Sequence, residues 1–114
     1  MKAIIYHNPM CSKSRQTVDI LKEKGVEFGV VEYLKSPPTK TELEEILEKL
    51  GKKPEEIIRK GEGIYKEFYA GKEFLDTELI DILVKNPALI ERPIVVMGDK
   101  AAIGRPPENV LEIL

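Results

Sequence analysis

The sequence predicts an α/β fold in which a β-α-β unit is followed by a helical segment, two antiparallel strands and a closing helix. Three observations lead to this prediction. Short apolar runs end at turn residues, longer segments carry apolar residues at helical spacing, and proline or glycine separates most of the segments. The 114 residues, of which 42% are hydrophobic and 33% charged, fit one globular domain covering 1–114.

The first third of the chain contains a strand, a helix and a second strand. Lys2–Tyr6 is a short apolar run that stops at turn residues, which favours a buried strand. Ser14–Lys24 carries apolar residues at helical spacing among charges, and Gly25 ends this helix. Glu27–Tyr33 has apolar and aromatic residues without a helical stripe. Because such a crossover leaves its two strands parallel, the opening is a parallel β-α-β unit.

The middle of the chain, about residues 37–90, is predicted to be a helical insertion. Thr39 and Glu42 have the spacing of a capping box, and apolar residues follow them at i, i+3, i+4 and i+7. Three segments follow: a short helix that begins at Pro54, the glycine-containing segment Lys60–Gly71 to which no element is assigned, and a helix capped by Asp76 or Thr77 and ended by Asn86-Pro87.

The end of the chain contains two strands and a helix. Ile94–Met97 and Ala101–Ile103 flank a predicted hairpin turn, Gly98–Lys100. Pro106 and Pro107 open a closing helix with Val110, Leu111 and Leu114 on one side. Together with the opening unit, these strands predict a mixed four-stranded sheet with helices on both faces, which is a thioredoxin-like (glutaredoxin-like) arrangement.

Composition excludes several classes of protein. The net charge of -2 gives no reason to expect a nucleic acid or an anionic membrane as partner. No apolar run approaches the length of a membrane span. One cysteine and one histidine provide neither an internal disulfide nor the ligands of a structural metal site. The start of the sequence lacks the apolar core of a signal peptide, so we expect a reducing cytoplasm as the compartment.

Cys11 is the candidate nucleophile. It lies between the first strand and the first helix, where the unpaired N–H groups and the positive end of the helix dipole favour a thiolate. A lone cysteine is otherwise a small buried hydrophobe, but this location favours the reactive interpretation. Because Ser14 stands where a C-x-x-C motif has its second cysteine, an external thiol must resolve any species formed on Cys11.

Neighbouring residues are candidates for oxyanion binding and for tuning the thiolate. Ser14 and Arg15 lie in the first helical turn, where a hydroxyl, a guanidinium and backbone N–H groups can face an oxyanion. Ser14 is equally well explained as a helix cap. His7 either stabilises the thiolate as an imidazolium or only ends the first strand.

An anionic substrate would require further cations. Lowering the pKa of a thiol by about two units gains only about two- to four-fold in rate at pH 7, because nucleophilicity falls too. Arginines that hold and orient the oxyanion must therefore supply most of the rate. Arg59, Arg92 and Arg105 are candidates, the last two in Arg-Pro pairs. Each alone is typical of a solvated charge, and spacing does not establish that they converge on Cys11.

Five segments of the chain carry a resemblance to a known family: HNPMCSKSR (7–15), EYLKSPPTKTEL (32–43), IIRKGE (57–62), LIDILVKNPALIERPIVV (79–96) and IGRPPENVLEIL (103–114). With these segments, the sequence resembles the glutaredoxin-coupled arsenate reductases of the ArsC type. The resemblance covers essentially the whole chain. The resemblance implies a thioredoxin-like fold with a helical insertion and no bound metal or cofactor. It also implies a reaction in which the cysteine attacks arsenate, glutathione acts as co-substrate and glutaredoxin completes reduction to arsenite.

The resemblance assigns roles to individual residues. Cys11 matches the nucleophile and His7 the histidine associated with its low pKa; Pro93 matches a proline expected to be cis. The three arginines that bind the oxyanion correspond to Arg59, Arg92 and Arg105.

Related proteins leave two alternatives open. One is a glutathione-dependent thiol reductase with another substrate, and the other is an Spx-type regulator that binds RNA polymerase. The C-x-x-S spacing and the retained Arg105-Pro106 pair favour the enzyme. Met10 and Lys13 differ from the residues typical of the reductases, and both flank Cys11.

Overall fold

The computed structural model describes residues 2–114, which form two compact units. The first unit combines residues 2–36 with residues 92–114, and the second contains residues 37–91. The second unit thus spans the segment in which the sequence analysis placed the helical insertion.

The first unit contains a four-stranded sheet in the order β2-β1-β3-β4. Strand β1 (Ala3–His7) is parallel to β2 (Phe28–Glu32) and antiparallel to β3 (Ile94–Met97), which pairs with the antiparallel strand β4 (Lys100–Ile103). The mixed sheet predicted from the sequence is therefore confirmed. Strand β4 begins one residue earlier than predicted, because Lys100 already pairs with Met97 across a tight turn.

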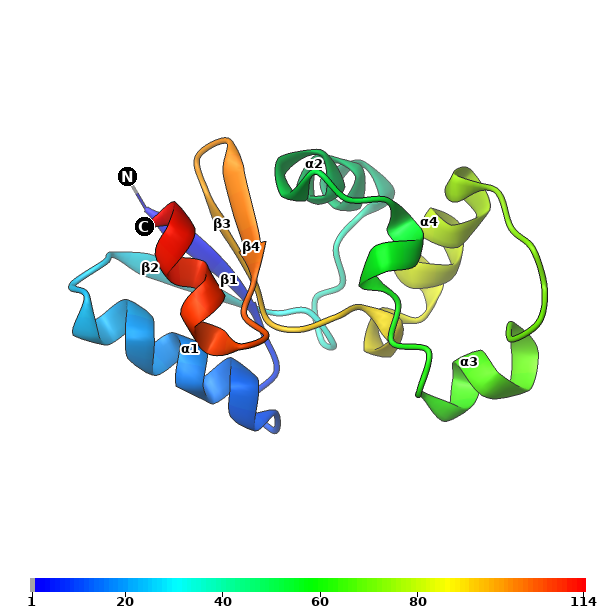
Figure 1. The fold of residues 1–114 in the computed structure, drawn as a ribbon, viewed down its shortest axis with the longest axis horizontal. Coiled ribbons are helices and arrows are strands. Elements are labelled where there is room, and N and C mark those ends of the chain that lie inside the picture. Colours follow the sequence, from blue (N-terminus) through cyan, green and yellow to red (C-terminus); the bar gives the residue numbers. More distant parts are fainter. Residues whose placement is uncertain (1) are drawn as a thin grey trace. The chain divides into compact units, whose positions relative to one another are not determined.

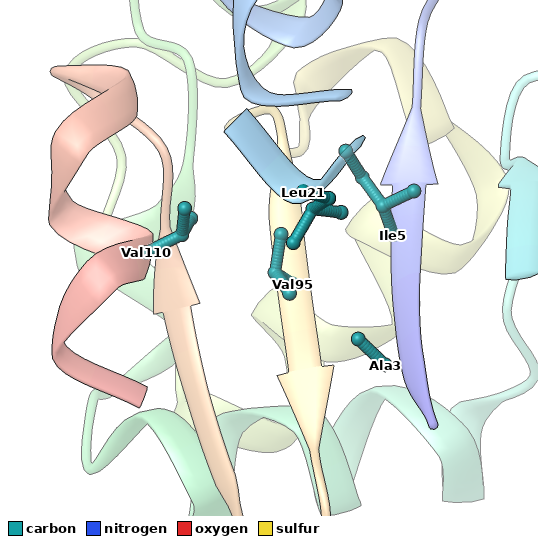
Figure 2. Close-up of a cluster of buried hydrophobic side chains, with 5 residues drawn as sticks. All are labelled: Ala3, Ile5, Leu21, Val95 and Val110. Atoms are coloured by element: carbon teal, nitrogen blue, oxygen red, sulfur yellow. The ribbon is translucent and has the colours of Figure 1, made fainter. Parts of the chain in front are cut away.

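Two helical elements cover one face of this sheet. They are α1 (Ser12–Glu23) and the 3-10 helix η3 (Pro107–Ile113), which appear in blue and red beside the strands in Figure 1. Their side chains meet the inward residues of the central strands in a cluster that Figure 2 shows: Ala3, Ile5, Leu21, Val95 and Val110. Both helical elements of this unit therefore lie on the same face of the sheet.

Of the three residues predicted to lie on one side of the closing helix, only Val110 is buried. Val110 is fully buried and Ile113 packs against the same cluster, whereas Leu111 and Leu114 are 43% and 37% exposed. The reason is that η3 is a 3-10 helix, in which residues three apart lie on one side. An α-helical spacing had placed Leu111 and Leu114 on the buried side instead.

The second unit is built from helices. Helices α2 (Lys40–Leu50) and α4 (Asp76–Lys85) pack together through their buried leucines and isoleucines. The shorter elements are η1 (Pro54–Ile57), α3 (Gly63–Phe68) and η2 (Pro87–Leu89). Helix α3 lies in the segment to which no element was assigned.

The local sequence predicted the N-cap residue of α2 but not that of α4. Thr39 and Glu42 form the predicted capping box of α2. At α4 the cap is Leu75, not Asp76 or Thr77, because the Glu78 carboxylate accepts a hydrogen bond from the Leu75 N–H. Asp76 instead lies in the first turn, where the positive end of the helix dipole stabilises its negative charge.

We expect Gly104→Ala to destabilise the protein. A Cβ at this position would lie 2.6 Å from Oγ1 of the buried Thr17 and 2.9 Å from the Pro93 ring. Neither neighbour moves easily, since Thr17 donates a hydrogen bond to the Lys13 carbonyl and proline is cyclic. The expected loss is about 1 to 3 kcal/mol in the free energy of unfolding, measured with urea. Gly61→Ala is the control, because a Cβ there would meet nothing within 4 Å; equal stability of the two variants would contradict the prediction.

Candidate active site

Cys11 is the N-cap residue of α1 and lies just after strand β1. Its backbone is extended, with φ -98° and ψ 123°, and the side chain is almost buried, with 8% of the residue exposed. Asn8 shapes the preceding loop: its carbonyl accepts from the Cys11 N–H at 3.0 Å and its Oδ1 accepts from the Met10 N–H at 3.0 Å. Met10 itself is 86% exposed. The loop therefore holds the sulfur at the start of the helix.

The structure favours the thiolate form of Cys11. Burial raises the pKa of the thiol, but the backbone amide of Ser14, the guanidinium of Arg92 and the backbone amide of Lys13 together lower it below its ordinary value. These groups stabilise the anion by hydrogen bonds and by charge. These donors lower the pKa in the direction that the position of Cys11 predicts, and a thiolate at pH 7 stays a prediction.

Arg92 and Arg105 converge on this sulfur. Nη2 of Arg105 lies 3.8 Å from Cys11 Sγ although the two residues are 94 positions apart in the sequence. Burial lowers the pKa of Arg92, but its hydrogen bond to Cys11 and the nearby Tyr33 raise it above its ordinary value. Two guanidinium groups therefore face the sulfur, which spacing in the sequence had not established.

Two hydrogen bonds connect the backbone around Arg92 with the segment that carries Arg105. Nε of Arg105 donates to the Arg92 carbonyl at 2.8 Å, and the Gly104 N–H donates to the Pro93 carbonyl at 2.8 Å. The Arg92–Pro93 bond is cis, as the resemblance implied, and so is Arg105–Pro106. The second cis bond was not predicted, although the same Arg-Pro dipeptide was visible there.

The Ser14 hydroxyl points inward and contributes little to an oxyanion site. Ser14 is fully buried, and its Oγ accepts from the Asn8 N–H at 3.0 Å and contacts His7 Nδ1 at 2.5 Å. What Ser14 supplies at the sulfur is its backbone N–H. The expectation that its hydroxyl would face an oxyanion is therefore corrected, because the hydroxyl is used to hold the His7–Asn8 segment.

His7 is not an imidazolium partner of the thiolate. Burial lowers the pKa of His7 below its ordinary value; Glu32 raises it and Arg15 lowers it to smaller extents. A histidine with a lowered pKa is neutral at pH 7. The charged interpretation of His7 is thus not supported. His7 contacts the Ser14 hydroxyl, and the Ser14 backbone amide binds the Cys11 sulfur. An indirect effect of His7 on the pKa of Cys11 stays a prediction.

Arg15 and Arg59 have other partners. Arg15 is exposed and its Nη1 donates to the Pro9 carbonyl at 2.8 Å, which braces the loop before Cys11. Arg59 belongs to the second unit, where Glu62 and Glu91 each accept from it at 3.2 Å. Oxyanion binding by these two arginines stays a prediction.

Two residues of this site were missed by the sequence analysis. Asn8 forms the turn that presents Cys11, and the Asn-Pro pair at positions 8 and 9 is a typical turn signal that could have indicated it. Tyr33 is 1% exposed and lies beside Arg92. Its role had no local signal, since a tyrosine at the end of a strand is common in any core.

Neither a metal nor a membrane span is indicated by the described part of the chain. Across residues 2–114, no three His, Cys, Asp or Glu side chains gather in a way that could hold a metal ion. Within the same residues, no helix has the length and apolar character needed to cross a bilayer.

We expect the alkylation of Cys11 by iodoacetamide to show the lowered pKa directly. The reaction rate follows the thiolate fraction, which rises as the pH passes through the pKa. Because the pKa of Cys11 is lowered, the midpoint of the rate profile should lie at lower pH than for a cysteine in a short unstructured peptide. Arg92→Ala should shift this midpoint upward. A midpoint equal to that of the peptide would contradict the thiolate assignment.

The fold and the site together define a thioredoxin-like protein with one cysteine at the start of a helix and two arginines at its sulfur. The sequence model of the ArsC family matches residues 6–113. The chain belongs to the ArsC family.

Individual relatives cover nearly the whole chain. The chain is 52% identical to "Uncharacterized protein YfgD" of Escherichia coli, over 96% of this chain and 94% of the relative. It is 45% identical to a protein of Haemophilus influenzae named "Arsenate reductase", over the full length of both. A solved structure described as arsenate reductase from Vibrio cholerae superposes with a TM-score of 0.95 at 43% identity, covering 100% of this chain and 98% of that one.

Proposed function

We propose that this protein is a thiol-dependent arsenate reductase in which the Cys11 thiolate attacks arsenate. The observation that carries the proposal is the convergence of Arg92 and Arg105 on a sulfur whose pKa is lowered. A site that only buried a cysteine would have no use for two guanidinium groups at that atom. Relatives named as arsenate reductases, 45% and 43% identical, support the choice of substrate.

The arginines offset the repulsion between the Cys11 thiolate and the arsenate anion. Arsenate at pH 7 is an anion, and so is the thiolate that must approach it. Two like charges 4 Å apart repel each other by about 4 kcal/mol at an effective dielectric constant of 20. Guanidinium groups offset this repulsion and bind oxygen atoms through a planar set of donors. Arg92 and Arg105 therefore hold the oxyanion against the sulfur, and we assign Arg59 the same task.

The proposed reaction balances as follows. Cys11 sulfur forms a bond to arsenic(V) while one arsenic–oxygen bond breaks, and that oxygen leaves as water after taking up protons. Reduction to arsenic(III) needs two electrons, and Cys11 has no second cysteine in the chain with which to form a disulfide. Two external thiols supply the electrons and leave as a disulfide. In total, one arsenic acid and two thiols yield one arsenous acid, one disulfide and one water.

The thiols in this proposal are glutathione and glutaredoxin, in the cytoplasm. A resolving thiol from outside is required by the C-x-x-S spacing, and a reducing compartment keeps such a thiol and Cys11 available. The groups that act in this scheme are Cys11, Arg59, Arg92 and Arg105 with the backbone N–H groups at the start of α1, and none of the proposed steps uses a metal or a bound cofactor.

The experiment that tests the proposal measures arsenite produced from arsenate by the purified protein. One arm contains glutathione and glutaredoxin with their reductase, a second omits glutaredoxin, and a third substitutes thioredoxin with its reductase. Arsenite formation that depends on glutaredoxin supports the whole proposal. Formation with thioredoxin alone supports arsenate reduction but contradicts the reductant, and no arsenite in any arm contradicts the function.

A further inference from the structure

Tyr33 lies at the same edge of the sheet as the loop that carries Cys11. His7, the last residue of β1, pairs with Glu32, the last residue of β2, in a parallel register. Tyr33 therefore follows β2 at the edge where the chain leaves β1 for the Cys11 loop. The strand register, which the local sequence does not show, is what places this tyrosine at the candidate site.

Arg92 and Arg105 reach this edge from the other two strands. Ile94, the first residue of β3, pairs with Ile103, the last residue of β4, and also with Tyr6 near the end of β1. Arg92 lies two residues before β3, and Arg105 lies two residues after β4. All four strands thus place a residue of the first unit at one edge of the sheet.

Tyr33 and Cys11 are both partners of the Arg92 side chain. Two strand spacings, about 10 Å, separate β2 from β3, and a tyrosine and an arginine side chain together span that distance. Arg92 has hydrogen bonds to the Cys11 sulfur and to the Tyr33 side chain. Nε of Arg92 is buried and has no hydrogen-bond partner among residues 2–114, so contacts at the other nitrogens must orient the guanidinium.

Tyr33 is suited to hold a flexible side chain in place. Only 1% of the residue is exposed, and its hydroxyl oxygen is buried. A phenol oxygen accepts hydrogen bonds from N–H groups, and such bonds are stronger inside a protein than in water. An arginine that the fold has already oriented loses less side-chain freedom when it binds an anion.

We propose that Tyr33 is a positioning residue whose buried hydroxyl holds the Arg92 guanidinium against the Cys11 sulfur. Arg105 is held differently, because its Nε donates to the Arg92 backbone carbonyl at 2.8 Å. Loss of the Tyr33 hydroxyl should therefore act on one of the two arginines only. The effect expected on arsenate turnover rests on the function proposed above, whereas the effect expected on the sulfur does not.

The experiment uses Tyr33→Phe, which removes the hydroxyl and keeps the ring. The pH midpoint of Cys11 alkylation by iodoacetamide should rise, because a loosely held guanidinium stabilises the thiolate less, and it should rise by less than in Arg92→Ala. The kcat/KM for arsenate should fall about three- to tenfold, the effect of one ordinary hydrogen bond. Tyr69→Phe is the matched control: it removes a hydroxyl that accepts from Asn86 at 3.3 Å, and it should change neither value.

A second set of variants shows whether the effect passes through Arg92. In an Arg92→Ala background, Tyr33→Phe should cause no further change in the alkylation midpoint. A residue that only filled the core would not move this midpoint, since phenylalanine keeps the buried ring. If thermal melting shows that Tyr33→Phe does not fold, Tyr33→Leu decides the question with the same measurements.

Two results would overturn the inference and leave the proposed function standing. One is an alkylation midpoint in Tyr33→Phe equal to or below that of the wild type. The other is an equal rise with and without Arg92, because Tyr33 would then act on the sulfur without the arginine. Absence of arsenite with the wild-type protein would instead contradict the proposed function, and the alkylation midpoints would still decide the role of Tyr33.

Discussion

Cys11→Ser is expected to reduce arsenite formation to the level measured without protein. The serine hydroxyl has a far higher pKa than a thiol, so it stays protonated at pH 7 and does not attack arsenic. The groups that lower the pKa of Cys11, including the Ser14 amide and Arg92, act on an anion that serine does not form. The measurement is the rate of arsenite production with glutathione and glutaredoxin in excess.

The same substitution should leave the fold intact, which makes the loss interpretable. Residue 11 is the N-cap of α1, and serine is among the preferred residues at that position. Thermal unfolding of the variant should therefore match or exceed that of the wild type. Ser12→Ala, at an exposed neighbouring position, is the control for a change in this turn. Arsenite formation at the normal rate in Cys11→Ser would remove the proposed mechanism.

Arg105→Ala is expected to produce the second largest effect, a fall in kcat/KM for arsenate of about 100-fold, the range seen when a charge-stabilising donor is removed from an active site. Arg105 reaches Cys11 Sγ with Nη2 while Nε donates to the Arg92 carbonyl. The variant therefore loses a cation at the sulfur and a contact that holds the other arginine. Steady-state kinetics with arsenate as the varied substrate measure this loss.

Comparison with lysine and with a neutral reagent separates the causes. Arg105→Lys keeps the charge, but a single ammonium group does not make both contacts, so recovery should be partial. Alkylation of Cys11 by neutral iodoacetamide should change only a few-fold in Arg105→Ala, since that reagent needs no cation. Lys100→Ala, at an exposed position on β4, should leave both rates unchanged. Equal losses with arsenate and with iodoacetamide would show that the substitution disturbs the fold instead.

Local sequence patterns predicted most of the secondary structure for identifiable physical reasons. The capping box at Thr39 and the apolar spacing that follows it involve residues within two turns of one another. Gly25, with φ +66°, closes α1 as expected for a residue without a Cβ. The two errors have different origins. At α4, Glu78 accepts from the Leu75 N–H three residues earlier, a local contact at a residue that is not a typical N-cap. The 3-10 geometry of η3 had no local signal.

The sequence analysis named most residues of the candidate site but did not predict how their side chains are arranged. The location of Cys11 between a strand and a helix was enough to predict a thiolate, because a helix start carries free N–H groups wherever it occurs. The direction of the Ser14 hydroxyl and the lowered pKa of His7 were not predictable, since the first depends on contacts with His7 and Asn8 and the second on burial.

The sequence by itself determined the order of the strands and of most helices, and it predicts the nucleophile and the need for an external thiol, because each depends on residues close together in the chain or on a cysteine count. Only the tertiary structure decided that Arg92 and Arg105 meet at Cys11 and that Glu91 binds Arg59. Such contacts join residues whose separation in the sequence says nothing of their distance in space. They follow from the strand register and from the backbone bonds around Pro93 and Ile90.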